Sequence, residues 1–477
     1  MSFIIGANSA VGGGGYNVAN GVRFDDGSSS NFTDGSAPAG NRQKFTWSAW
    51  FKRSSVGATQ ILASSSHSGS DEGYLFLSGG GVLGWQSNNS GDGDLTTAML
   101  WRDLSAWYHV VFSVDTTQST STNRIKLYVN GSQYTWDGNT TQPNQNQSLY
   151  FNVGGNYNTY IGRRAGGDYY DGYMSEIVFI DNAQLAADSF GEFDSDSGIW
   201  KPLESVADLT FGTSGYYLNF QDSAALGDDV SGNGNDFTVN NLTAIDQTTD
   251  TCTNNFATLN FLYPTGGGFD NQSGATFEEG NTKFTTDNGD ADWGTCVSSI
   301  AVSSGKWYVE MKKISGTGGV IGIRGTNSDN DNGYIGRLTH GVGYQQSGDK
   351  RIAGTQSTYG DTWTTNDIIG VALDLDNNKL YFSKNGTFQD SGDPTSGATG
   401  TGAISVDAAS STVLGVYYIG ATEINSSGNG TFNFNFGNPS FSISSGNTDG
   451  NGYGNFEYAV PSGYYALCTK NLGAYGG

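Results

Sequence analysis

Two groups of tyrosine and arginine residues have the composition expected of ligand-binding loops. The first group consists of Tyr157, Tyr160, Arg163, Arg164, Asp168, Tyr169 and Tyr170. The second group consists of Arg324, Tyr334, Arg337, Tyr344, Tyr359 and Trp363. Aromatic rings stack on the C–H faces of sugars, and polar neighbours hold the hydroxyls. Both groups are predicted to bind a carbohydrate or a protein; the alternative is that the rings cap sheet edges, because the chain has 26 Tyr.

Two acidic loops have the hard oxygen ligands and the glycines that a calcium site uses. Their candidate ligands are Asp228, Asp229, Asn233 and Asp236 in the first loop, and Asp329 and Asp331 in the second. Neither loop places a Glu at the twelfth position, as an EF-hand does. A solvated turn held by Asp and Asn side chains is the other interpretation. No other cofactor is expected.

The strands that would position these residues begin with alternating segments in the N-terminal half. These segments are 22–24, 45–51, 107–115, 124–131 and 172–180. Apolar residues fall on both faces of 45–51, so we expect a strand with one face on a core and the other partly covered. The motifs FTWSAWFKR, WYHVVFSVD, RIKLYVNG and YMSEIVFID resemble, in order and spacing, the laminin-G-like, concanavalin A-like jelly-roll family. This resemblance covers about residues 21–200 and implies an antiparallel β-sandwich.

A second series of strands follows in the C-terminal half. GKWYVEM is followed by DIIGVALDLDNNKLYFSKNG and, later, by FNFNFG. The long motif is two strands joined by an Asn-Asn turn, and it resembles the central hairpin of the SPRY family. The resemblance spans about residues 277–443. It implies a second β-sandwich, whose variable loops would form a peptide-binding face.

Catalysis is not predicted from the acidic residues. Jelly-roll glucanases carry Glu-x-Asp-x-x-Glu, which places an acid and a nucleophile on one face, and the chain lacks that pattern. Glu176 and Asp181 lie an odd number of residues apart and would face opposite ways on a regular strand. Asp374 and Asp376 share a face but run into a turn, and only three His are present. We therefore expect a non-enzymatic protein; a polysaccharide depolymerase is the least favoured alternative.

The composition of the chain disfavours some classes of binding partner. The net charge of −24 disfavours nucleic acid and anionic membranes, because both require clustered Lys and Arg. No apolar run approaches the roughly 18 residues of a membrane span, and the N-terminus has no basic region of a signal peptide. The chain is therefore expected to fold in a cytoplasm. Cys252, Cys296 and Cys468 show no paired spacing and are predicted to be free thiols.

The predicted all-β organisation has four parts. Residues 1–20 are a flexible arm, 21–200 the jelly roll, 201–264 a connector rich in Gly, Asn and Thr, and 265–477 the SPRY-like sandwich with a C-terminal tail. One short helix is expected in 182–190. The pairing of the two sandwiches and the tail GNFEYAVPSGYYALCTKNL resemble virion appendage proteins of marine tailed bacteriophages. This resemblance implies a virion fibre, spike or decoration protein that binds a host-surface glycan or protein, or a purely architectural subunit. It also implies a homo-oligomer, of which a trimer is the first expectation, attached to other virion proteins through the arm.

Overall fold

The computed structural model describes residues 16–68, 71–87, 93–261, 275–286, 293–326, 334–424 and 429–476. The chain divides between Asn255 and Phe256 into two compact units, here called the first unit (residues 16–255) and the second unit (residues 256–476). Both units are built of strands, nearly all antiparallel. The α-helix α1 (Thr469–Tyr475) is the only one in the described ranges. The predicted all-β class is confirmed.

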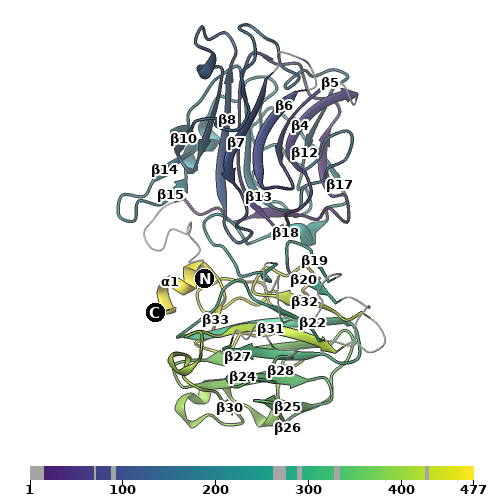
Figure 1. Ribbon diagram of the computed structural model, residues 1–477, viewed down its shortest axis with the longest axis vertical. Helices are drawn as coiled ribbons and strands as arrows, with labels where there is room; N and C mark the ends of the chain where they lie inside the picture. Colours follow the sequence, from purple (N-terminus) through teal and green to yellow (C-terminus); the bar gives the residue numbers. More distant parts are fainter. Residues whose placement is uncertain are drawn as a thin grey trace. The chain divides into compact units, whose positions relative to one another are not determined.

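The first unit is a sandwich of two eight-stranded sheets, drawn from purple to teal in Figure 1. Sheet A has the order β10-β9-β8-β3-β13-β1-β18, with β16 also beside β13. Its strands are β1 (Gly21–Phe24), β3 (Lys44–Arg53), β8 (Tyr108–Asp115), β9 (Ile125–Val129), β10 (Ser132–Tyr134), β13 (Gly172–Asp181), β16 (Tyr216–Leu218) and β18 (Gln247–Thr248).

Sheet B has the order β11-β7-β6-β5-β4-β12-β2-β17. Its strands are β2 (Asn31–Asp34), β4 (Gln60–Ser68), β5 (Asp71–Leu77), β6 (Val82–Ser87), β7 (Asp94–Leu100), β11 (Thr140–Thr141), β12 (Asn158–Ile161) and β17 (Thr238–Asn240). A small separate pair is formed by β14 (Gly191–Phe193) and β15 (Trp200–Pro202). The first unit also contains the 3₁₀ turns η1 (Ser121–Asn123), η2 (Ala187–Ser189), η3 (Glu204–Asp208) and η4 (Ala244–Asp246). The short helix expected in 182–190 is thus only the turn η2.

Strand β3 shows how sheet A is buried on both faces. Phe45, Trp47 and Phe51 pack into the core between the two sheets. Trp50, which points the other way because side chains alternate along a strand, packs into a second cluster with Phe190 and Trp200. The expectation that one face of this strand meets the core and the other is covered is confirmed.

The predicted connector 201–264 is wrong, because residues up to Asn255 belong to the first unit. Within this segment β16 pairs with β13, β17 with β2 and β18 with β1. Phe211 and Tyr217 are buried against the outer face of sheet A. Single aromatic residues spread among Asn, Thr and Gly carry no strand periodicity, although each fills a place on a sheet.

The predicted arm 1–20 also needs a correction at its end. Val18 is buried in the cluster on the outer face of sheet A, and its carbonyl accepts a hydrogen bond from Thr251 Oγ1 at 2.9 Å. Residues 16–20 are therefore part of the first unit. Residues 1–15, which include the apolar patch Phe3-Ile4-Ile5, lie outside the described residues.

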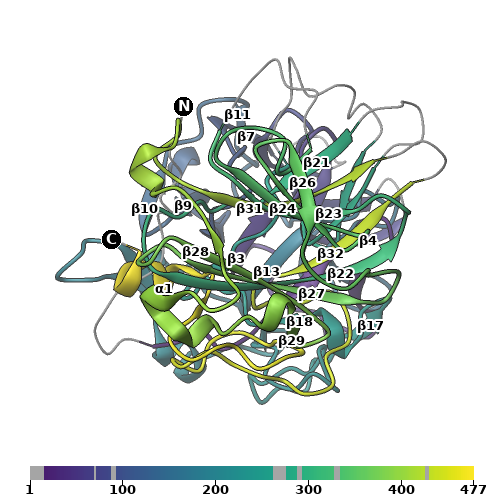
Figure 2. The ribbon, with the colours of Figure 1, turned by 90° about the horizontal axis from the view of Figure 1, so that it is seen from below.

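The second unit, drawn in green to yellow, is another two-layer sandwich (Figures 1 and 2). Sheet C has the order β19-β20-β32-β22-β27-β28-β29, with β30 and β33 at its sides. Its strands are β19 (Thr276–Glu278), β20 (Lys283–Thr285), β22 (Lys306–Ser315), β27 (Ile368–Asp374), β28 (Lys379–Lys384), β29 (Thr387–Phe388), β30 (Ile404–Ser405), β32 (Thr431–Asn435) and β33 (Tyr465–Ala466).

Sheet D has the order β21-β31-β23-β24-β25-β26. Its strands are β21 (Trp293–Val297), β23 (Val320–Arg324), β24 (Gly341–Gln345), β25 (Asp349–Ile352), β26 (Thr355–Thr358) and β31 (Tyr418–Ile424). The 3₁₀ turns of this unit are η5 (Gln389–Ser391), η6 (Pro394–Thr399) and η7 (Ala409–Ser411). The predicted hairpin is β27–β28, which Asp374 and Lys379 close as opposite partners.

The outer face of sheet C is covered by the C-terminal tail. Phe456, Tyr464 and Cys468 pack there against Tyr308 and Tyr381. All three cysteines of the chain are buried, and none forms a disulfide bond. No helix of the described residues is both long enough and apolar enough to span a membrane.

Candidate functional site

A row of side chains crosses the outer face of sheet B, one from each of seven neighbouring strands. Strand register places the following residues side by side: Asp94, Gln86, Tyr74, Ser64, Tyr160, Thr33 and Thr238. The residues next to them in sequence, such as Leu75 and Trp85, enter the core instead. The row therefore follows from the two-residue period of a strand, and it makes this face polar with two tyrosines at its centre.

The loop after β12 brings Arg163 over this row. Gly162 adopts a φ of 83°, and a Cβ there would meet the Phe24 ring at 2.8 Å, so the sharp turn requires glycine. The Arg163 guanidinium carbon then lies 5.1 Å from the centre of the Tyr160 ring and 5.0 Å from that of Tyr169. Ser64 Oγ fastens the loop by donating to the Arg163 carbonyl at 2.8 Å.

Arg163 is rigidly held but its charge is not neutralised. Its Nε donates to the Arg164 carbonyl at 2.9 Å and its Nη2 to the Ala165 carbonyl at 3.1 Å. It makes no ion pair with any residue that the structure describes, and its side chain is partly exposed. Two rings and two carbonyls thus fix a positive charge at the surface of an acidic protein.

Arg164, the next residue, is satisfied within the protein. Its Nε lies 2.6 Å from Asp168 Oδ2 and its Nη1 lies 2.9 Å from Glu72 Oε1. Its guanidinium covers the Tyr74 ring at 5.1 Å. Two carboxylates therefore hold Arg164 in place, and it closes the centre of the row rather than offering a charge to a ligand.

The structure brings together five of the seven residues of the first predicted group, namely Tyr160, Arg163, Arg164, Asp168 and Tyr169. Tyr157 lies beyond the start of β12, where its ring contacts His67 at 5.4 Å and Tyr150 at 6.1 Å. The sequence analysis missed Glu72 and Tyr74. The alternation in 71–77 could have identified them, because it places Glu72 and Tyr74 on the face of the strand that Leu75 does not occupy.

Tyr170 is not a surface residue, so its assignment to the binding group is wrong. Its side chain is fully buried in the core of the first unit, with the ring edge-on to Phe24 at 5.6 Å. Its hydroxyl donates to the Lys52 carbonyl at 2.8 Å. Tyr169 and Tyr170 are adjacent in an extended segment, so they point to opposite sides.

The second predicted group needs a larger correction. Tyr344, Tyr359 and Trp363 pack in the core of the second unit around Phe382, and Arg324 is also buried. Tyr334 remains partly exposed, with its hydroxyl accepting from Arg351 Nη1 at 2.8 Å, and Arg337 is exposed. These six residues therefore do not form one binding face. Three of the four aromatic rings lie inside the sandwich, and the spacing of these residues in the sequence did not indicate this burial.

The first acidic loop is held by its own amides. Asp229 accepts from the backbone N of Tyr217 (2.8 Å), Ser231 (2.9 Å) and Asn235 (2.9 Å). Asp236 accepts from the Asp229 backbone N at 2.9 Å, and Asn233 donates to the Gly212 carbonyl at 2.6 Å. Asp228 is exposed. These contacts are those of a turn held by Asp and Asn side chains; calcium binding by this loop remains a prediction. Asp329 and Asp331 lie outside the described residues.

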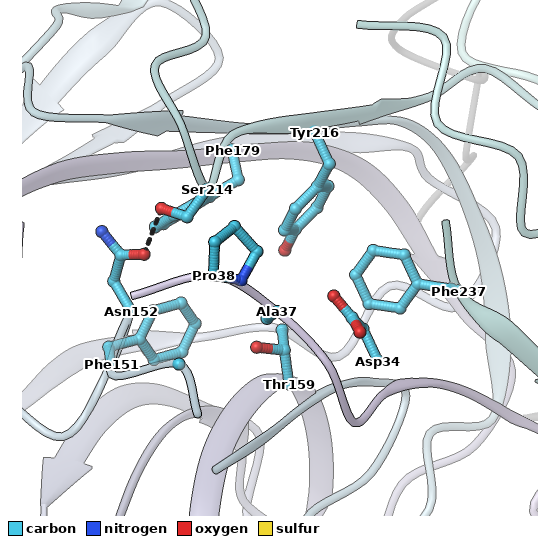
Figure 3. A pocket seen from close by; sticks show the side chains of 11 residues that line it. Asp34, Ala37, Pro38, Phe151, Asn152, Thr159, Phe179, Ser214, Tyr216 and Phe237 are labelled. Atoms are coloured by element: carbon cyan, nitrogen blue, oxygen red, sulfur yellow. Dashed lines mark hydrogen bonds between the residues drawn. The ribbon is translucent and has the colours of Figure 1, made fainter. Parts of the chain in front are cut away.

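A narrow hollow opens at one end of the first sandwich (Figure 3). Phe151, Phe179 and Phe237 form its walls, and the hydroxyl of Tyr216 and the carboxylate of Asp34 point into it. Ser214 Oγ donates to Asn152 Oδ1 on its rim. The free space fits a water-sized guest only, so the hollow is too small for a sugar or a peptide side chain.

A serine and a histidine also meet under the outer face of sheet A, but not as a catalytic pair. Trp200 Nε1 donates to His109 Nδ1 at 3.0 Å, so the proton of the neutral ring is on Nε2, which lies 2.9 Å from Ser48 Oγ. Burial lowers the pKa of His109 to about 3. A histidine that donates to the serine cannot remove its proton, so this contact is structural.

The acidic pair considered on β13 is also closed to substrate. A bulge between Ser175 and Val178 makes the strand irregular, so the spacing argument does not apply. Glu176 is buried, with the Tyr217 hydroxyl donating to its Oε2 at 2.5 Å, and Asp181 Oδ1 accepts from the Asn41 backbone N at 2.7 Å. Glu176 lines a hollow of the described structure with Ser48 and His109, but that hollow has room for a water-sized guest only.

Two family models match the chain in the regions that the motifs indicated. The model of the Concanavalin A-like lectin/glucanases superfamily matches residues 25–188, and the model of the SPRY domain matches residues 305–404. The first match lies within the first unit and the second within the second unit. The chain therefore contains a concanavalin A-like domain followed by a SPRY domain.

Curated relatives are similar over a short stretch. Ran-binding protein 9 of Danio rerio is 36% identical over 91 residues, which are 18% of this chain and 15% of the relative. Ran-binding protein 9 of Homo sapiens is 35% identical over 91 residues, or 18% of this chain and 12% of the relative. The match thus spans less than a sixth of the length of either relative.

Solved structures are similar at low sequence identity. The SPRY domain of human HERC1 is 18% identical with a TM-score of 0.27, and the match covers 34% of this chain and 91% of that chain. A heptameric SAP-like pentraxin from Limulus polyphemus is 19% identical with a TM-score of 0.27, and the match covers 36% of this chain and 80% of that chain.

Proposed function

We propose that the protein is a non-enzymatic binding protein whose first unit holds an anionic glycan on the outer face of sheet B. The observation that carries this proposal is Arg163, a partly exposed guanidinium fixed between Tyr160 and Tyr169 without an acidic partner among the described residues. A guanidinium presents a planar fork of donors that fits a carboxylate or a sulfate. The ligand class is therefore a glycan that bears uronate or sulfate groups.

The neighbouring charges favour Arg163 over Arg164 and Lys52. Arg164 and Lys52 each lie within 3 Å of a carboxylate oxygen, so their charge is already compensated. Stacking on two rings fixes the Arg163 side chain and lowers the entropy that binding would otherwise cost. Gln86 and Thr33, which lie in the row on either side of the two tyrosines, can hydrogen-bond sugar hydroxyls.

The setting proposed for this binding protein is a virion. The support is the sequence resemblance to appendage proteins of tailed bacteriophages, in which two sandwiches would be displayed as a homo-oligomer through residues 1–15. In this setting the first unit contacts a host-surface glycan, and the SPRY domain contacts a protein. Quantitative cryo-electron microscopy of particles with and without residues 1–15 tests the setting; unchanged copy number after the deletion contradicts it.

The binding proposal is tested with the full chain on arrays of uronate-bearing, sulfated and neutral oligosaccharides. Wild type should bind the anionic members, with the affinity falling at high salt because the contact is ionic. Arg163→Ala should weaken binding at least tenfold, and Arg163→Lys should restore part of it, because a lysine keeps the charge but loses the fork.

Arg351→Ala is the matched control. Arg351 also covers a tyrosine, with its guanidinium 4.7 Å from the Tyr334 ring centre, but it lies in the second unit. Binding should be unchanged in this variant. Equal binding of neutral glycans, or full binding by Arg163→Ala, would overturn the proposal and favour an architectural subunit. Release of reducing ends from a bound polysaccharide would favour a depolymerase.

A further inference from the structure

Three aspartates of the first unit lie close together at the ends of β1 and of the loop 162–171. Asp25 and Asp26 directly follow β1, and Asp171 directly precedes β13. These two strands are antiparallel neighbours, and Phe24 is opposite Gly172. The register of the sheet therefore brings residues more than 140 positions apart in the chain to the same corner.

The spacing of the three carboxyl groups fits a single ion. One oxygen from each group lies within 4.8 Å of the others. Calcium binds oxygen at 2.3–2.6 Å, so two ligands on opposite sides of one ion are separated by roughly 4.6–5.2 Å. The triangle is thus no wider than the coordination sphere of one calcium ion.

Asp171 provides a second observation that is independent of the clustering. Its side chain is only 4% exposed, and its Oδ1 is buried without a hydrogen-bond donor among the described residues. Two other buried carboxylates, Asp250 and Glu310, are satisfied: Asp250 accepts from Lys52 Nζ and Trp107 Nε1, and Glu310 accepts from backbone amides. An unpaired carboxylate oxygen inside a protein is costly, so this one points to a missing positive partner.

Arg53, whose charge acts on Asp171, does not supply that partner. The Arg53 guanidinium donates its Nη1 to the Trp101 carbonyl at 3.1 Å, and its Nε and Nη2 make no hydrogen bond to any described residue. The corner therefore holds three acidic groups with no direct salt bridge to Arg53.

We propose that Asp25, Asp26 and Asp171 form a binding site for a hard divalent cation, for which calcium is the best candidate. The three groups offer only oxygen, which excludes a preference for zinc or copper. Asp26 is exposed and Asp25 partly exposed, so water completes the shell and the affinity is moderate. The ion joins the end of β1 to the loop 162–171, the same loop that carries Arg163 and Tyr169.

Calcium titration of the full chain, first freed of metal with chelator, tests this site. Calorimetry should give one site, and at free calcium about 100-fold above the dissociation constant the melting temperature of the first unit should rise by about 5–10 °C. Asp26→Asn, a change at an exposed residue, should weaken calcium binding at least tenfold without loss of the fold. Asp171→Asn should do the same and lose the melting shift.

Asp236→Asn is the matched control, because Asp236 lies in the acidic loop 228–236 and not at this corner. It should keep wild-type calcium binding. Absence of calcium binding by wild type, or wild-type binding by both Asp26→Asn and Asp171→Asn, would overturn the proposal. These results do not depend on glycan binding, so failure here and failure of the proposed function are separate outcomes.

Discussion

The two units bury a glutamate in the same structural situation and satisfy it in different ways. In each unit one sheet has its outer face covered by chain that follows the sandwich strands: residues 183–217 and 250–255, called the first cover, and residues 437–476, called the second cover. Under the first cover, Glu176 receives the Tyr217 hydroxyl at 2.5 Å. Under the second, Glu310 receives the backbone N of Glu457 and Tyr458 at 2.9 and 2.8 Å.

The difference shows two ways of attaching an irregular segment to a sheet. A hydroxyl fixes one side chain and leaves the backbone of the first cover to other contacts. Two adjacent amides fix the backbone itself, so Glu310 acts as an anchor for the second cover. Asn435 Nδ2 adds a further bond to Glu310 at 3.1 Å. The second cover should therefore depend more strongly on its glutamate than the first cover does.

Buried lysine–carboxylate ion pairs show the opposite difference: the pair of the first unit attaches the cover, and the pair of the second unit does not. Lys52 of β3 pairs with Asp250 of the first cover at 2.5 Å, and both side chains are almost completely buried. Lys313 of β22 pairs with Glu423 of β31, which joins sheets C and D instead of attaching a cover. In the first unit the ion pair holds the cover, whereas in the second unit it holds the sandwich together.

Breaking these pairs should have the largest effect. Asp250→Ala leaves the Lys52 charge buried with Asn255 Oδ1, 2.8 Å away, as its remaining acceptor, and should cost about 3–5 kcal/mol. Glu423→Ala should reach the upper end of that range, because the backbone N of Thr317 and Gly318 also lose their acceptor. Denaturant unfolding measures both losses.

Hydrogen exchange with mass spectrometry then separates the two roles. Asp250→Ala should increase exchange in the first cover and β3 while β5 and β6 stay protected. Glu423→Ala should increase exchange in both sheets of the second unit. Lys52→Met combined with Asp250→Ala should recover part of the loss, since no buried charge remains. Uniform exchange changes across a unit in both variants would refute the distinction.

The two glutamates should also give the protein a shared pH response of intermediate size. Burial raises the pKa of Glu176 and that of Glu310 to about 7, from 4.5. The folded state therefore keeps a proton that the unfolded state releases, and stability falls as pH rises from about 4.5 to about 7. Each glutamate contributes on the order of 3 kcal/mol to this fall in the free energy of unfolding. The stabilising contribution of the two glutamates is greatest below pH 4.5.

Glutamine variants distinguish the two attachments. Glu176→Gln should be nearly neutral at pH 5, because an amide carbonyl accepts from the Tyr217 hydroxyl. Glu310→Gln should cost about 1–3 kcal/mol at pH 5, because the side chain then has one accepting oxygen for two backbone amides. Both variants should reduce the slope of the pH profile of their own unit, measured in chelator so that the metal content is the same in every sample. An unchanged slope in either variant would contradict the assignment of its glutamate.

The sequence predicted the sandwiches well and the covers poorly, for one physical reason. The strand pattern in 45–51 and in the hairpin 367–386 is strong because these segments are long, regular strands that pair with other strands. Residues such as Phe211, Tyr217 and Phe456 cover a sheet from irregular chain, so no period marks them. Five residues of the first group lie together because Tyr160 and Arg163 flank the turn at Gly162 and Tyr169 follows in the same loop; ligand binding by them remains a prediction. The second group failed because Tyr344, Tyr359 and Trp363 meet only in the folded core.

The smallest predicted effect concerns two tyrosines, one in each unit, that were predicted to bind a ligand and are buried in the core. The Tyr170 hydroxyl donates to the Lys52 carbonyl, and the Tyr344 hydroxyl donates to the Asp361 carbonyl. Tyr170→Phe and Tyr344→Phe should each cost about 1 kcal/mol in the free energy of unfolding and leave glycan binding unchanged. Tyr169→Ala, on the ring that covers Arg163, should have the opposite profile: near-normal stability and weaker binding. If Tyr170→Phe weakened binding as much as Tyr169→Ala, the boundary drawn here between core and binding face would be wrong.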